Sequence, residues 1–145
     1  MNSEPGTKVA PIVTAAGSEE SNTGQSGGAV RISGVSVDNS PATKLWFGRV
    51  WNAPGYRSLP HHHGEAETGG YVLSGVARIY YGEDYSEWVD MKTGDWVFVP
   101  PYMPHIEANM STTEELHWLT TRTPGNIVIN LPEVDDSTLD SFHRA

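Results

Sequence analysis

Residues 54–75 read PGYRSLPHHHGEAETGGYVLSG, so that three consecutive histidines follow a Pro-Gly turn and precede a strand-like segment. Side chains alternate along a strand, and His61 and His63 are therefore expected on one face and His62 on the other. Two imidazoles at this spacing can share a metal ion. The alternative is a chance surface patch or a tag remnant, but a tag would be terminal and longer, whereas this run is internal. We therefore predict that His61 and His63 bind a metal.

Short strand-like segments recur on both sides of the histidines, separated by turn sequences. The 15 glycines and 10 prolines interrupt the chain so often that few windows could hold a long helix. The expected strands cover residues 30–35, 43–51, 70–81, 85–91, 95–99, 115–121 and 126–131. Short strands at this spacing predict an all-β fold, either a sandwich or a barrel, with almost no helix.

Composition excludes several classes of function. Aspartate and glutamate number 18 against 9 basic residues, and the resulting net charge of −9 argues against nucleic acid or an anionic membrane as partner. Cysteine is absent, which excludes disulfides, thiolate metal sites and cysteine nucleophiles. No apolar run approaches the roughly 20 residues of a membrane span, and the N-terminal residues do not resemble a secretion signal. We expect a cytoplasmic protein.

The chain divides into three parts by composition. Residues 1–28 are rich in Ser, Gly, Glu and Pro, and are expected to form a flexible arm or at most an edge strand. Residues 29–133 hold the strand-like segments and form the domain. Residues 134–145 are a polar tail, in which a short helix capped by Asp136 or Ser137 is expected.

Two motifs resemble those of the cupin superfamily. The first comprises Pro54-Gly55, His61, His63, Glu67 and the segment 71–75, and the second comprises Gly94, Pro100, Pro104-His105 and Asn109. The resemblance implies a double-stranded β-barrel, or jelly roll, with a metal bound inside. It also implies that His61, His63 and His105 are ligands, often together with the glutamate of the first motif.

The sequence departs from the cupin pattern at two places. Tyr102 stands where the second motif usually has glycine. Seven residues instead of six separate Glu67 from Gly75, so the usual carboxylate position falls on Thr68. A bulge at residues 69–70 could absorb the extra residue, because both are glycine. Glu67 therefore stays open as a ligand, a catalytic base or a bystander.

A fourth histidine is a further candidate ligand. Residues 104–120 are predicted to form a hairpin whose register places His105 opposite His117, with Cβ atoms about 4.5–5.5 Å apart. In the alternative register, Leu116 and Trp118 form the core face and His117 is solvated. Because the strand after the second motif generally lines the pocket in cupins, the resemblance favours His117 as a ligand.

Four neutral imidazoles would suit zinc, with iron, nickel, copper and manganese as alternatives. The chain length and the HHHGEAETGG segment resemble small single-domain cupins of actinomycete aromatic-polyketide pathways that act as cyclases. This resemblance implies an aldol cyclisation and dehydration of a poly-β-keto chain in antibiotic biosynthesis. Either zinc-bound hydroxide or Glu67 would be the base.

The expected partner is a small hydrophobic, carbonyl-rich substrate, either free or bound to a carrier protein, in a pocket with aromatic walls. Arg49, Arg57 and Arg78 are the arginines expected within reach of this pocket. A homodimer is expected because cupins commonly form dimers. Two other functions stay open, namely a cupin dioxygenase using iron, nickel or copper, and a non-catalytic or sugar-modifying cupin.

Overall fold

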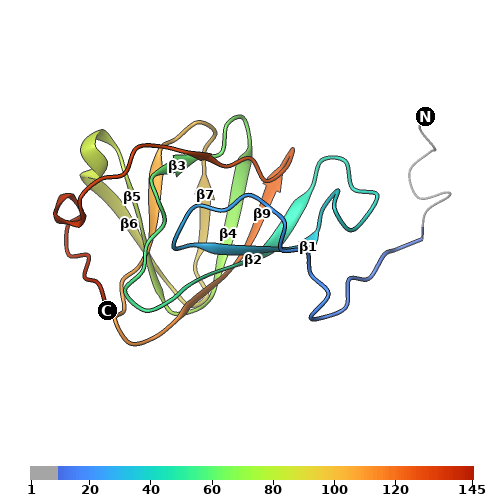
Figure 1. Ribbon diagram of the computed structural model, residues 1–145, viewed down its shortest axis with the longest axis horizontal. Helices are drawn as coiled ribbons and strands as arrows, with labels where there is room; N and C mark the ends of the chain where they lie inside the picture. Colours follow the sequence, from blue (N-terminus) through green and yellow to red (C-terminus); the bar gives the residue numbers. More distant parts are fainter. Residues whose placement is uncertain (1–9) are drawn as a thin grey trace.

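The computed structural model describes residues 10–145 and contains two antiparallel β-sheets packed face to face (Figure 1). The first sheet has the order β1-β2-β9-β4-β7 and the second the order β10-β3-β8-β5-β6. The strands are β1 (Val30–Val35), β2 (Trp46–Asn52), β3 (His61–His62), β4 (Glu67–Ser74), β5 (Val76–Tyr81), β6 (Glu87–Lys92), β7 (Trp96–Val99), β8 (His105–Asn109), β9 (Leu116–Thr123) and β10 (Ile129–Asn130). The predicted all-β fold is confirmed.

Helix is confined to two short 3-10 turns among the described residues, η1 (Glu83–Tyr85) and η2 (Asp136–Thr138). In residues 10–145, no helix is long and apolar enough to cross a membrane. The predicted strand 70–81 is two strands, because Gly75 turns the chain between β4 and β5 with a φ of 106°. The short strand β3 lies outside the seven strand segments expected from the sequence, although the alternation expected of His61 and His63 assumed an extended chain there.

The main hydrophobic core lies between the two sheets. Its buried side chains alternate along the strands with outward ones, as period-two patterning requires. The cluster comprises Ala29, Val50, Val72, Ala77, Ile79, Met91, Val99, Leu116 and Trp118. One part of the sandwich interior is polar instead of apolar, and it contains the histidines described below.

The C-terminal segment covers the outer face of the second sheet. Leu139 and Phe142 pack with Tyr80, Ile106 and Ala108 in a second buried cluster. Strand β8 is therefore buried on both faces, with polar side chains inward and apolar ones toward the C-terminal segment. The predicted terminal helix is the 3-10 turn η2, and its capping residue is Asp135, whose side chain accepts from the Ser137 amide.

Part of the expected N-terminal arm packs along the domain. Glu20 pairs with Ser33 in a β-bridge, and Ser26 is buried. Residues 1–9 of that predicted arm lie outside the described residues. The division of the chain into arm, domain and tail stays a prediction.

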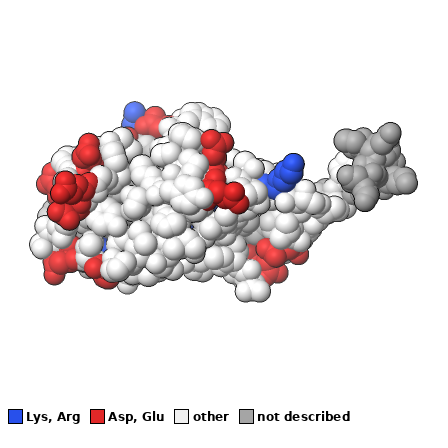
Figure 2. All heavy atoms as spheres, turned by 90° about the horizontal axis from the view of Figure 1, so that it is seen from above, with Lys and Arg blue, Asp and Glu red and all other residues white. Residues whose placement is uncertain are grey.

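Charged side chains at the surface are mainly acidic. Figure 2 shows several groups of aspartate and glutamate on one face and few basic side chains there. Three of the arginines, Arg31, Arg57 and Arg122, are buried. The surface is therefore acidic, as the net charge of −9 indicates, whereas part of the interior is basic.

Tyr102, at the usual glycine position of the second motif, adopts a left-handed conformation with a φ of 60°. Its amide donates to the Gly64 carbonyl at 2.8 Å, which ties the turns of the two motifs together. A side chain in this region costs about 1–2 kcal/mol, and the Tyr102 side chain, at 65% exposure, recovers little by packing.

We expect Tyr102→Gly to raise the free energy of unfolding by about 0.5–1 kcal/mol. This figure is the relief of left-handed strain less the entropy cost of glycine in the unfolded chain. Urea unfolding followed by tryptophan fluorescence would measure the change. Tyr102→Ala retains a Cβ atom and should give no gain; an equal gain from alanine would contradict the explanation.

Candidate metal centre

Three histidines and one glutamate meet inside the barrel. His61 on β3 pairs directly with His105 on β8, and His63 follows two residues after His61. Glu107 lies two residues after His105 and therefore projects to the same face of β8. All four residues are buried, and their candidate ligand atoms lie within 4.8 Å of one another.

Backbone carbonyls fix the orientation of all three imidazole rings. The Nδ1 atoms of His61, His63 and His105 lie 2.8, 2.7 and 2.9 Å from the carbonyl oxygens of Leu59, Ile127 and Met103, respectively. Because a carbonyl only accepts, each Nδ1 carries the proton and each Nε2 offers a lone pair. A metal-binding histidine is typically held in this way.

Glu107 supplies the carboxylate of the cluster. Its Oε1 lies 3.1 Å from His61 Nε2, 3.7 Å from His105 Nε2 and 3.2 Å from Arg31 Nη2. Burial alone would raise the pKa of this carboxyl, but the positive charge of Arg31 outweighs burial and holds the pKa well below its usual range. Glu107 is therefore a carboxylate at neutral pH.

Burial keeps two of the imidazoles neutral. It lowers the pKa of His61 to about 4, with a further contribution from His105. The pKa of His63 is also lowered, first by burial and then by the nearby charge of Arg122. Neutral imidazole is the form that binds a metal.

The donor set fits a divalent ion. Three imidazole Nε2 atoms and one carboxylate suit zinc, iron or manganese, so the donor set does not identify the ion. The carboxylate lowers the formal charge of such a centre from +2 to +1. The structure therefore brings together three imidazoles and a carboxylate instead of four neutral imidazoles.

Comparison with known proteins identifies the family. Residues 50–122 match the Cupin domain. The chain belongs to the cupin family. A search of curated protein sequences gave no match.

Several solved structures share this cupin fold. The polyketide cyclase RemF from Streptomyces resistomycificus is 16% identical with a TM-score of 0.67, over 92% of this chain and 96% of that chain. Oxalate decarboxylase from Bacillus subtilis is 23% identical with a TM-score of 0.63, over 74% of this chain but only 28% of that chain. An uncharacterized conserved protein from Klebsiella pneumoniae with a double-stranded beta-helix domain is 19% identical with a TM-score of 0.61, over 74% of this chain and 87% of that chain. At these identities the likeness shows the fold alone.

Glu67, the glutamate of the first cupin motif, lies outside the cluster. It is exposed at the start of β4, opposite Thr123, whereas Thr68 is buried and points inward. The predicted bulge at residues 69–70 is wrong, because β4 and β7 pair without interruption there and the irregularity falls between Val72 and Ser74. The extra residue thus shifts the glutamate to the outer face of the strand.

His117 also lies apart from the other three histidines. The predicted hairpin is wrong, because β8 pairs with β3 and β5 while β9 pairs with β2 and β4 in the other sheet. Leu116 and Trp118 take the core face of β9, and His117 Nε2 lies 3.1 Å from Glu115 Oε1 at the surface. The structure therefore does not place His117 among the candidate ligands.

Sequence reasoning missed Glu107, Arg31 and Arg122. Arg31 Nη2 lies 3.4 Å from His61 Nε2, and Arg122 Nη2 lies 3.0 Å from His63 Nε2. Strand alternation could have indicated Glu107, since it shares a face with His105. The arginines named from the sequence lie elsewhere: Arg49 is exposed, Arg57 pairs with Glu133 and Asp136, and Arg78 pairs with Asp90.

The free space beside the cluster is small. A cavity of about 20 Å³ is lined by Thr68, His105, Glu107, Thr120 and Arg122, with apolar side chains completing its walls. This volume holds about one water molecule.

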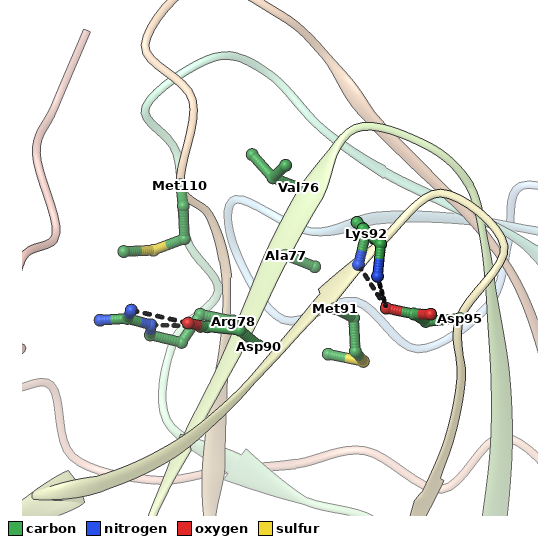
Figure 3. Close-up of a pocket in the computed structure, with 8 residues that line it drawn as sticks. All are labelled: Val76, Ala77, Arg78, Asp90, Met91, Lys92, Asp95 and Met110. Atoms are coloured by element: carbon green, nitrogen blue, oxygen red, sulfur yellow. Dashed lines mark hydrogen bonds and ion pairs between the residues drawn. The ribbon is translucent and has the colours of Figure 1, made fainter.

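A larger hollow of about 280 Å³ lies near the β5–β6 hairpin, and none of the four cluster residues lines it (Figure 3). Its charged side chains pair with one another, Arg78 with Asp90 and Lys92 with Asp95. The cluster is therefore the better candidate site.

Proposed function

We propose that this cupin is a metal-dependent enzyme in which His61, His63, His105 and Glu107 hold one divalent ion. The observation that supports the proposal is the convergence of three oriented Nε2 atoms and one carboxylate in a buried site. A bound divalent ion would supply Lewis-acid polarisation of a substrate carbonyl. The protein's own part is to fix the ligands, to keep the imidazoles neutral and to exclude bulk water.

For the reaction, we propose aldol cyclisation and dehydration of a poly-β-keto substrate. This is supported by the similarity in fold to the polyketide cyclase RemF, which covers nearly the whole of both chains. The cavity of about 20 Å³ has room for about one water molecule, so the barrel must widen to admit this substrate. Because Glu67 is exposed, no role as the base is proposed for it.

A dioxygenase is the second candidate, and Glu107 is the observation that favours it. Two imidazoles and one carboxylate are the donor set of many non-haem iron oxygenases, and this site contains them together with a third imidazole. Four imidazoles, as expected from the sequence, would not match that set. The bound metal and oxygen uptake therefore separate the two functions. A cyclase is expected to hold zinc and to consume no oxygen, whereas a dioxygenase is expected to hold iron and to consume oxygen.

Metal removal tests the proposed reaction directly. We expect zinc-loaded protein to convert a poly-β-keto thioester, generated in situ by a minimal polyketide synthase, into a dehydrated cyclic product without oxygen uptake. After treatment with a chelator, the rate should fall by at least about 10³-fold and return when zinc is restored, because the Lewis acid supplies several kcal/mol of charge stabilisation. Mass spectrometry and an oxygen electrode provide the readouts.

Two results would contradict the proposal. Unchanged turnover in protein shown by elemental analysis to be free of metal would refute metal dependence. Oxygen uptake that accompanies product formation only in iron-loaded protein would instead establish the dioxygenase.

A further inference from the structure

Arg122 is a buried guanidinium without an ion-pair partner among residues 10–145. It lies on β9 with 2% of its surface exposed. Its Nε donates to Thr68 Oγ1 at 3.0 Å, its Nη1 donates to Asn126 Oδ1 at 2.8 Å, and its Nη2 donates to His63 Nε2 at 3.0 Å. All three acceptors are neutral.

The other two buried arginines have carboxylate partners. Arg57 pairs with Glu133 and Asp136 at 2.9 and 2.8 Å, and Arg31 pairs with Glu107 at 3.2 Å. The ring of Trp46 lies 5.6 Å from the Arg122 guanidinium. A cation–π contact of this kind contributes about 0.5–2 kcal/mol, which is small beside the cost of burying a charge. Within residues 10–145, Arg122 therefore has no carboxylate at ion-pair distance, and Glu107 acts on it only as a more distant charge.

Arg122 remains charged at neutral pH. A guanidinium is not deprotonated in proteins at this pH. A buried charge without a partner is destabilising unless a bound group compensates for it. Arg122 also lines the small cavity that His105 and Glu107 share, so a group in that cavity would be close to both the guanidinium and the metal ligands.

Metal binding would remove one of the three acceptors. The Nε2 lone pair of His63 accepts from Arg122 in this structure, and the same lone pair is the one that a metal would use. The Nη2 group would then have lost its acceptor beside the ion. A divalent ion, Arg31, Arg122 and Glu107 would together carry a formal charge of +3. This excess of buried positive charge favours the binding of an anion.

We propose that Arg122 binds a negatively charged oxygen of the substrate beside the metal centre, and that the substrate is an anion with a carboxylate or a β-dicarbonyl enolate. The inference rests on the proposed metal centre. Metal and anion should bind cooperatively, since the ion occupies the lone pair that otherwise holds Arg122. By thermodynamic linkage, the anion raises the metal affinity by the same factor.

Calorimetric titration tests this proposal with two probes, acetylacetonate for an enolate and acetate for a carboxylate. Zinc-loaded wild-type protein should bind at least one probe about 10-fold or more tightly than metal-free protein does. Arg122→Gln should weaken that binding by about 10- to 100-fold, the value of a charge-assisted hydrogen bond, while the protein still holds zinc. Arg122→Lys retains the charge and should lie between the two. Zinc content is measured after each titration.

Arg49→Gln is the matched control. Because Arg49 is exposed, its substitution should leave the affinity for either probe unchanged. The probe that binds more tightly assigns the substrate as enolate or carboxylate. Equal affinity of Arg122→Gln and wild type with zinc retained would overturn the proposal. Two further results would overturn the proposal even if Arg122→Gln does not fold. One is equal probe affinity of the metal-free and the zinc-loaded wild type. The other is equal probe affinity of Arg49→Gln and Arg122→Lys. Failure of the wild type to bind zinc would instead refute the proposed function.

Discussion

Glu107→Gln is expected to lower the free energy of unfolding of the metal-free protein by about 3–5 kcal/mol, the usual cost of removing one partner of a buried ion pair. The substitution retains the shape of the side chain but leaves Arg31 fully buried without a carboxylate at 3.2 Å. Urea unfolding followed by circular dichroism would measure the loss.

Glu115→Gln is the matched control for this measurement. Glu115 is exposed and pairs with His117 at the surface, so its replacement should change the stability by no more than about 0.5 kcal/mol. If Glu107→Gln changed the stability as little as this control does, the description of Glu107 as the buried counter-ion of Arg31 would be contradicted.

His63→Ala is expected to lower the zinc affinity by more than about 100-fold, because the loss even of a group that only orients a ligand costs about 10- to 100-fold. His63 offers an oriented Nε2 to the cluster, and alanine at this position would leave the ion without that ligand. Competition with a chromogenic chelator measures the affinity, and elemental analysis checks the zinc content.

Two other histidines serve as controls. The ring of His62 accepts from the Gly64 amide, and the ring of His117 lies against Glu115, so neither faces the cluster. His62→Ala and His117→Ala should retain the wild-type zinc affinity. Loss of zinc in His117→Ala would contradict the position described for that residue and would restore it as a ligand.

Local patterns in the sequence were sufficient to predict several features. Alternation along a strand placed His61 and His63 on one face, and both residues are buried in the cluster. Turn residues separated the strands closely enough for the all-β fold to be predicted. The two cupin motifs also assigned His105 to the same site, although it lies more than 40 residues after His63 in the chain.

Strand pairing was not accessible from the sequence in the same way. Strands β8 and β9 are neighbours in sequence, and a hairpin was the simplest expectation, but they belong to different sheets. The partner of β8 at His105 is β3, which is distant in sequence. For Glu67, the extra residue before Gly75 was visible in the sequence and left the role of this residue open, because a shift of one residue inverts the face of the strand.

The buried charges were the hardest to predict. Arginine is usually exposed, so Arg31 and Arg122 were not considered as interior residues. Their burial depends on contacts with residues distant in sequence, such as Glu107 for Arg31 and Thr68 for Arg122. No local pattern records these contacts.

X-ray absorption spectroscopy of zinc-loaded protein tests the central claim most directly, namely that His61, His63, His105 and Glu107 hold one ion. We predict one zinc ion per chain, with nitrogen and oxygen neighbours at about 2.0–2.2 Å and imidazole scattering that fits three rings. The same measurement on His117→Ala should give the same spectrum. Four imidazoles in the wild type, or no imidazole scattering at all, would contradict the claim.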